Sequence, residues 1–155
     1  MSRIGKLPVS LPQGVTVTVG NDNVVKVKGP LGELSQKVDA DIKVAVEGGV
    51  VTVSRPTDQP RHRSLHGLYR ALINNMVVGV STGFQTRQEL VGVGFRVEVK
   101  GQILEFNLGF SHDIHFELPA EIKGEAEPVK KGANPILVLK SCDKQLLGMV
   151  AAKIR

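Results

Sequence analysis

Apolar and polar residues alternate in short runs along the first half of the chain. Valines alternate with threonines over residues 15–19 and with lysines over residues 25–28, on either side of an Asn and Asp turn at residues 21–23. A period of two is typical of half-buried strands in an antiparallel hairpin. The same alternation, broken by Gly and Pro turns, predicts further strands over residues 34–38, 42–46 and 50–53.

The period of the apolar pattern changes after Pro60. From Leu65 to Val80, apolar residues recur at spacings of three and four, which is typical of an amphipathic helix. The second half of the chain repeats this plan and predicts a helix with apolar residues from Leu146 to Ile154. The strands expected before that helix cover residues 95–99, 104–108, 114–118 and 136–139.

Two short motifs indicate that the chain contains one unit twice. Residues 25–29 (VKVKG) resemble residues 97–101 (VEVKG), and residues 41–44 (DIKV) resemble residues 113–116 (DIHF). Both pairs are separated by 72 positions. Two motifs rarely keep one register by chance, so we expect a duplicated domain.

The predicted fold class is α+β, with two similar tandem domains, each a small, mostly antiparallel sheet packed with one helix. Residues 1–82 form the expected N-terminal repeat domain and residues 83–155 the expected C-terminal repeat domain. The chain has 155 residues, of which 41% are hydrophobic. That is enough for two small cores of about 75 residues each, both modest in stability.

Cysteine content and apolar runs predict the compartment. The single cysteine, Cys142, excludes an internal disulfide framework and fits a reducing cytosol. No apolar run follows the basic residues at the N-terminus, and no stretch reaches the length that spans a membrane. We therefore expect a soluble protein that stays in the cytoplasm.

The net charge of +5 is unevenly distributed along the chain. Residues 55–70 carry four Arg and one Asp, and residues 140–155 carry four Lys or Arg and one Asp. Residues 113–127 instead carry five acids and one Lys. Such segregation predicts separate basic and acidic regions. The alternative is an ordinary excess of solvated charges on a small basic protein.

The basic residues gather where the two helices are expected to begin. Arg61 and Arg63 lie at the start of the first helix, and Lys140 and Lys144 flank the start of the second. Cations there oppose the helix dipole unless an anion binds nearby. With no Trp, one Tyr and five Phe, phosphate and sugar contacts to structured RNA are a better expectation than base stacking.

The histidines do not predict a metal site. His62 and His66 are four residues apart, as two zinc ligands on a helix would be, but two arginines flank His62 and would repel a dication. His112 and His115 have opposite parity, which in a strand places them on opposite faces. We therefore expect no metal ligand among the four.

The sequence supports neither catalysis nor nucleotide binding. Nothing in it brings Cys142 together with Asp143 and His112, as a catalytic thiol would require. The glycines of residues 92–94 precede an alternating strand instead of opening a helix, so they do not match a dinucleotide-binding loop. We expect no catalytic site, no cofactor and no small-molecule substrate.

Several segments along the whole chain resemble bacterial ribosomal large-subunit protein six, a family of duplicated two-domain proteins that bind ribosomal RNA. Each segment alone is a weak signal, and together they are specific. They are residues 2–6 (SRIGK) with Pro8, 27–30 (VKGP) with 32–34 (GEL), 55–56 (RP), 66–67 (HG), 89–96 (ELVGVGFR), 109–112 (GFSH) and 143–145 (DKQ).

The resemblance implies a structural constituent of the large ribosomal subunit that binds large-subunit ribosomal RNA near the translation-factor-binding region. It implies neighbouring ribosomal proteins as further partners, no membrane and no catalysis. A basic protein-interaction module that binds an acidic partner is the alternative. The resemblance also implies that the C-terminal half makes most of the contacts with RNA. The expected RNA-binding residues are therefore Lys140, Lys144, Lys153 and Arg155, with Ser111 and His112 in a nearby loop, and Arg61 and Arg63 in the first domain.

Two further expectations concern Arg96 and the C-terminus. Arg96 is either a solvated strand residue or an RNA contact. The family's signature rich in Pro, Tyr, Lys and Gly would begin just after Arg155. Because the second helix would end there without a capping residue, we expect a C-terminal tail.

Overall fold

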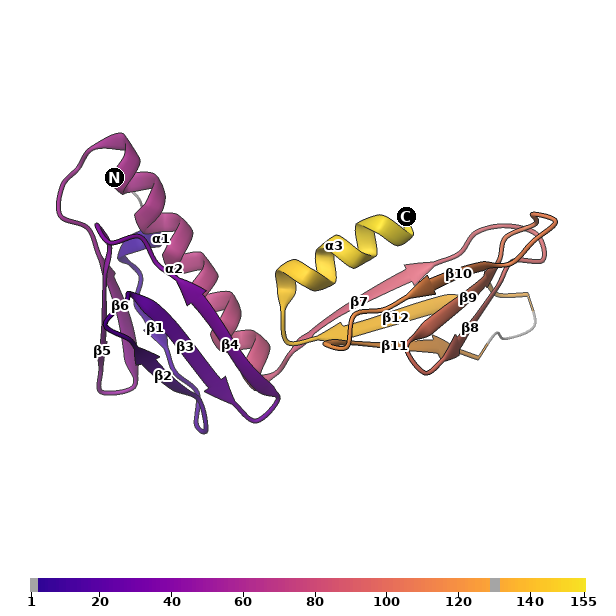
Figure 1. Ribbon diagram of the computed structural model, residues 1–155, viewed down its shortest axis with the longest axis horizontal. Coiled ribbons are helices and arrows are strands. Elements are labelled where there is room, and N and C mark those ends of the chain that lie inside the picture. Colours follow the sequence, from indigo (N-terminus) through magenta and orange to yellow (C-terminus); the bar gives the residue numbers. More distant parts are fainter. Residues whose placement is uncertain (1–2, 129–131) are drawn as a thin grey trace. The chain divides into compact units, whose positions relative to one another are not determined.

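The computed structural model describes residues 3–128 and 132–155 and divides the chain into two compact units, the first ending at Gly83 and the second beginning at Phe84 (Figure 1). Within the described residues, each unit contains two three-stranded antiparallel sheets and one long helix. The predicted α+β class with two similar halves is confirmed, with two small sheets in each half where one was expected. No helix in this described part is long and apolar enough to span a bilayer.

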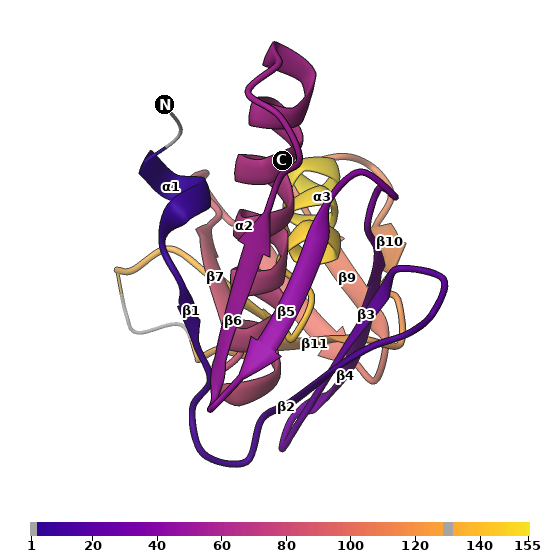
Figure 2. The ribbon, with the colours of Figure 1, turned by 90° about the vertical axis from the view of Figure 1, so that its left-hand side faces the viewer.

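The first unit places its six strands in two sheets. β6 lies between β1 and β5, and β3 lies between β2 and β4. Figure 2 shows β5 and β6 side by side with α2 next to them. The elements are α1 (Arg3–Lys6), β1 (Val9–Ser10), β2 (Thr16–Val19), β3 (Val24–Gly29), β4 (Gly32–Lys37), β5 (Lys43–Glu47), β6 (Val50–Ser54) and α2 (Pro60–Ser81).

The second unit repeats this strand order. β12 lies between β7 and β11, and β9 lies between β8 and β10. Each element therefore has a counterpart in the first unit, from β1 and β7 through β6 and β12 to α2 and α3. The elements are β7 (Phe84–Glu89), β8 (Arg96–Lys100), β9 (Ile103–Asn107), β10 (Ile114–Glu117), β11 (Ile122–Glu127), β12 (Ile136–Ser141) and α3 (Lys144–Ile154).

The expected register of the duplication, a shift of 72 positions, is wrong. Residues 25–29 lie in β3, whereas residues 97–101 lie in and just after β8, which is the counterpart of β2. Likewise, residues 113–116 overlap β10, the counterpart of β4, and not the counterpart of β5. The motifs match because alternating Val and charged residues suit any half-exposed strand.

A pair of amide side chains gives the true register. Asn23 Nδ2 donates to the carbonyl oxygens of Asp39 (3.1 Å) and Ile42 (3.2 Å), just before β5. In the second unit, Gln102 Nε2 donates to the carbonyl oxygens of Pro119 (3.0 Å) and Ile122 (3.4 Å), at the start of β11. The equivalent residues are 79 or 80 positions apart. An amide side chain therefore makes the same pair of hydrogen bonds to the equivalent loop in both units.

Each unit has its own hydrophobic core. In the first, α2 buries Ile73, Met76, Val77 and Val80 against the valines of the sheets. In the second, α3 buries Leu147 and Val150 against leucines and Ile122. α2 contacts β3 and β4 as well as β6, whereas α3 packs chiefly on β12 and β7.

β7 and β11 are the long strands that the apolar pattern did not predict. The inward positions of β7 include Thr86 and Gln88, and those of β11 include Gly124. A Cβ at Gly124 would lie only 2.8 Å from Leu118 Cδ1, so the neighbouring leucines already fill that space. Without large apolar side chains at alternate positions, the sequence gives no visible period of two.

Candidate nucleic-acid interface

The start of α2 carries Arg61 and Arg63 in its first turn, as predicted. Arg61 is two-thirds exposed, and its Nη2 lies 3.3 Å from Asp39 Oδ2 and 3.8 Å from Asp41 Oδ2. The backbone N–H of Asp41 (3.1 Å) and the nearby Arg61 guanidinium hold the pKa of Asp39 below its ordinary value. The anion beside this helix start is thus supplied by the protein itself. Arg63 is exposed and has no ion-pair partner among the described residues.

The two histidines of this helix contact different partners. His62 Nε2 lies 3.2 Å from Asp41 Oδ2, and its Nδ1 lies 2.6 Å from Thr57 Oγ1. His66 is buried, with Nε2 2.8 Å from the Val53 carbonyl oxygen. His62 therefore links the loop before β5 to the loop before α2, and His66 belongs to the buried core of the unit. No group of three metal-ligating side chains occurs in the described residues.

The start of α3 is capped by an acid. Asp143 Oδ1 accepts hydrogen bonds from the backbone N–H groups of Gln145 (2.9 Å) and Leu146 (3.2 Å). This carboxylate opposes the positive end of the helix and accounts for the helix beginning at Lys144. Lys144 Nζ lies 5.4 Å from the centroid of the Phe84 ring, within the range of a cation–π contact.

Lys140 is in β12 and is paired across the sheet. Its Nζ lies 2.7 Å from Glu125 Oε2, and both side chains are about half exposed. The β11–β12 register places Lys123 directly opposite Lys140, so the two lysines share one face of the sheet. Lys123 is exposed. The sequence did not single out Lys123, because only the strand pairing brings it beside Lys140.

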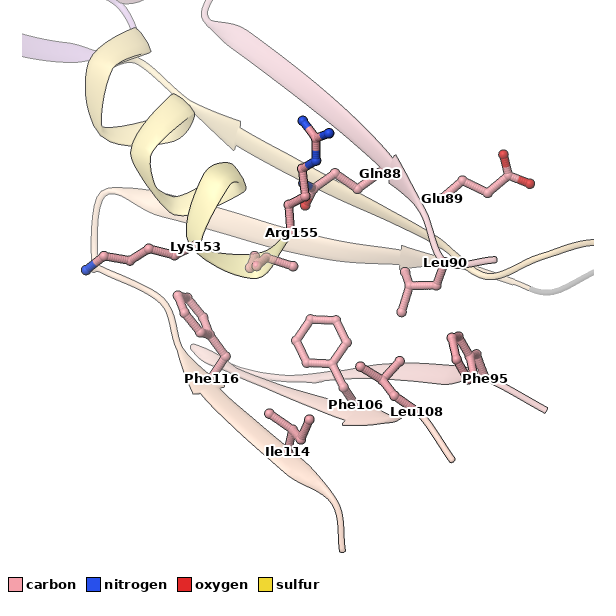
Figure 3. A pocket seen from close by; sticks show the side chains of 11 residues that line it. Gln88, Glu89, Leu90, Phe95, Phe106, Leu108, Ile114, Phe116, Lys153 and Arg155 are labelled. Atoms are coloured by element: carbon pink, nitrogen blue, oxygen red, sulfur yellow. The ribbon is translucent and has the colours of Figure 1, made fainter. Parts of the chain in front are cut away.

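Lys153 and Arg155 lie at the other end of α3, on the rim of an apolar groove of about 640 Å³ (Figure 3). The rings of Phe106 and Phe116 point toward the end of the helix, whereas the charged end of Lys153 points away from the groove. Gln88 Nε2 donates to the Ala151 carbonyl oxygen (2.9 Å) and fixes this last turn. β9 and β10, whose side chains line this groove, correspond to β3 and β4 of the first unit, which are covered by α2.

Ser111 and His112 lie in the exposed loop between β9 and β10. The His112 ring stacks on Phe110, with centroids 5.8 Å apart and planes inclined by 22°. At the base of the loop, Asn107 Nδ2 donates to Asp113 Oδ1 (3.0 Å). Phe110 belongs to the segment of residues 109–112 that carries the resemblance, but it was not among the predicted RNA-binding residues.

The predicted RNA-binding residues of the second unit lie in several separate places. Lys140 and Lys144 lie at the end of β12 and the start of α3, while Lys153 and Arg155 lie at the opposite end of that helix. An α-helix of eleven residues is about 16 Å long, so these two pairs lie at separate sites on the unit. Arg96, at the start of β8, pairs in register with Asn107 and is exposed.

Comparison with known proteins identifies relatives along the whole chain. The family model described as Ribosomal protein L6 matches residues 11–83. Large ribosomal subunit protein uL6 of Parabacteroides distasonis and that of Amoebophilus asiaticus are each 57% identical to this chain over all of its residues. The uL6 protein of Bacteroides fragilis is 52% identical. In each case the match covers 84% of the relative.

Proposed function

The chain belongs to the ribosomal protein L6 family, and from this premise we propose that it binds large-subunit ribosomal RNA near the translation-factor-binding region, beside neighbouring ribosomal proteins. The identity of 57% along the whole chain confirms the resemblance drawn from its motifs. Membership of this family makes the chain a structural protein of the large ribosomal subunit, in the cytoplasm, and the proposed role includes no catalysis.

The observation that carries the proposal is the pair of lysines on the exposed face of β11 and β12. Lys123 and Lys140 are directly opposite each other in the register, where like charges repel. Glu125 neutralises only one of the two cations. A phosphate group of an RNA backbone would relieve the remaining repulsion and release counterions on binding.

At its helix start the first unit offers one cation without an ion pair, Arg63, whereas in the second unit Lys144 and the nearby Lys123 both lack one among the described residues. Arg61 is held by two carboxylates there, so a phosphate would have to compete with Asp39 and Asp41 for its guanidinium. This difference supports the C-terminal unit as the main RNA-binding half. Arg63 remains available for RNA or for a neighbouring protein.

A gel-shift titration with fragments of large-subunit ribosomal RNA tests the proposal. We expect binding that weakens steeply as salt rises, because each phosphate contact adds about one unit to the slope of log K against log salt. The alternative function, a protein-interaction module for an acidic partner, would be favoured by absence of RNA binding at low salt together with binding to an acidic protein.

A further inference from the structure

The side chain of one phenylalanine, Phe110, is mostly exposed to solvent. The chain has five Phe and one Tyr, and all six lie within the described residues. Phe110 is 61% exposed, whereas the other five are buried or half-buried. The ring of its neighbour His112 stacks on it, with centroids 5.8 Å apart, so the two rings together form a platform in this exposed loop.

The loop that carries these two rings packs against the side chain of Phe95. Gly109 adopts a φ of +79°, which a glycine tolerates and other residues rarely do. A Cβ at Gly109 would be 3.8 Å from the Phe95 ring, and a Cβ at Gly92 would clash with the same ring. Phe95 is therefore packed between the loop before β8 and the loop after β9. Such preorganisation reduces the entropy that the loop loses when it binds a partner.

The chemistry of the loop favours a flat, uncharged partner. Residues 109–112 contain no Lys or Arg, so the tip of the loop offers no cation of its own to a phosphate group. A face of phenyl and imidazole instead matches the π-face of a nucleobase. Unpaired bases in RNA loops are commonly splayed out and stacked on Phe and His side chains.

We propose that Phe110 and His112 form a platform on which an unpaired nucleobase of the bound RNA stacks. The inference rests on the proposed function and adds to it a contact that is not ionic. It assigns to the loop a role distinct from that of Lys123 and Lys140, because stacking selects a single-stranded base, whereas the lysines attract phosphates of any sequence.

The test compares RNA affinity and salt slope for Phe110→Ala, Phe110→Tyr and Ile103→Ala. We expect Phe110→Ala to weaken binding about five-fold or more with an unchanged salt slope, because no phosphate contact is lost. Phe110→Tyr keeps a ring and should bind like the unaltered chain. Ile103 is also exposed, at the other end of β9, and its truncation controls for the loss of apolar surface. Circular dichroism of all variants establishes that each is folded.

Three results would overturn the inference. The first is RNA binding by Phe110→Ala within two-fold of the unaltered chain. The second is an equal loss for Ile103→Ala, which would point to a general apolar effect. The third is absence of RNA binding by the unaltered chain at low salt, which would remove the proposed function as well. Only the third outcome counts against both.

Discussion

Lys140 and Glu125 form an ion pair across β11 and β12, with 2.7 Å between Nζ and Oε2. A cation expected to contact RNA is therefore already engaged with an acid of its own unit. Because both side chains are about half exposed, the pair adds little to folding stability. Under the proposed function, the main consequence of this ion pair is that RNA and Glu125 would compete for Lys140.

Glu125→Gln should therefore strengthen RNA binding. The change frees Lys140 and removes one negative charge near the RNA, and we expect the affinity at low salt to rise about two- to five-fold. Glu117→Gln is the control, since Glu117 is exposed and has no ion-pair partner in the described residues. A similar gain from both changes, measured by filter binding, would show a general charge effect and no specific competition.

Lys123→Ala tests the residue that strand pairing brings beside Lys140. We expect weaker RNA binding and a salt slope lower by about one unit, as for the loss of a single phosphate contact. Lys26, exposed on β3 of the first unit, gives the matched Lys→Ala control. An unchanged slope for Lys123→Ala would exclude Lys123 from the interface.

Gly29→Ala should destabilise the first unit by about 1–3 kcal/mol through overpacking. A Cβ at Gly29 would lie 2.7 Å from the Val80 carbonyl oxygen, a backbone atom that also accepts the Leu31 N–H (3.0 Å). In Gly20→Ala the new Cβ has only an ordinary contact, 3.6 Å from the Val24 oxygen. Thermal unfolding measures both variants, and equal melting temperatures would contradict this account of the β3–α2 contact.

The Lys100–Glu105 ion pair predicts a pH dependence of stability in the second unit. The hydrogen bond and charge of Lys100 hold the pKa of Glu105 below its ordinary value, and Glu105 in turn raises the pKa of Lys100. The Glu105 contribution is therefore present above pH 4.5 and is lost as the pH falls through the lowered pKa. The Lys100 contribution is present below pH 10.5 and is lost as the pH rises through the raised pKa.

Glu105→Gln should accordingly lower the melting temperature near pH 7 and have a smaller effect in strong acid, where Glu105 is protonated in both states. Glu117→Gln is the control, because Glu117 is an exposed acid on β10 of the same sheet and takes no part in this ion pair. A difference between Glu105→Gln and the unaltered chain that stays constant from pH 7 to strong acid would contradict the assignment.

Sequence patterns predicted the elements that have a regular apolar face and missed those that do not. The valines of β3 alternate with polar residues and the apolar residues of α2 recur at spacings of three and four, so the sequence predicted both elements. β11 has one large apolar residue, Ile122, because Leu104 and Leu118 fill the space above Gly124. The duplication was predicted from motifs on non-equivalent strands, and only the shared Asn23 and Gln102 hydrogen bonds gave the register.

The residue types of the candidate interface could be predicted, but their partners could not. Charge counts identified Lys140 and Arg61 without revealing that Glu125 and Asp39 hold them. Those pairings depend on strand register and loop closure, which bring together residues 15 and 22 positions apart. The position of Lys123 depends on the same register.

The central claim is that the second unit makes most of the contacts with RNA. The salt dependence of RNA binding by two double variants tests this claim most directly. Lys140→Ala with Lys144→Ala should weaken binding and lower the slope by up to about two units, while the chain stays folded. Arg61→Ala with Arg63→Ala should cost less, because Arg61 lies beside two carboxylates, those of Asp39 and Asp41, whereas Lys140 lies beside one, that of Glu125. Equal losses would mean that both units grip RNA, and a larger loss for the arginine pair would contradict the account.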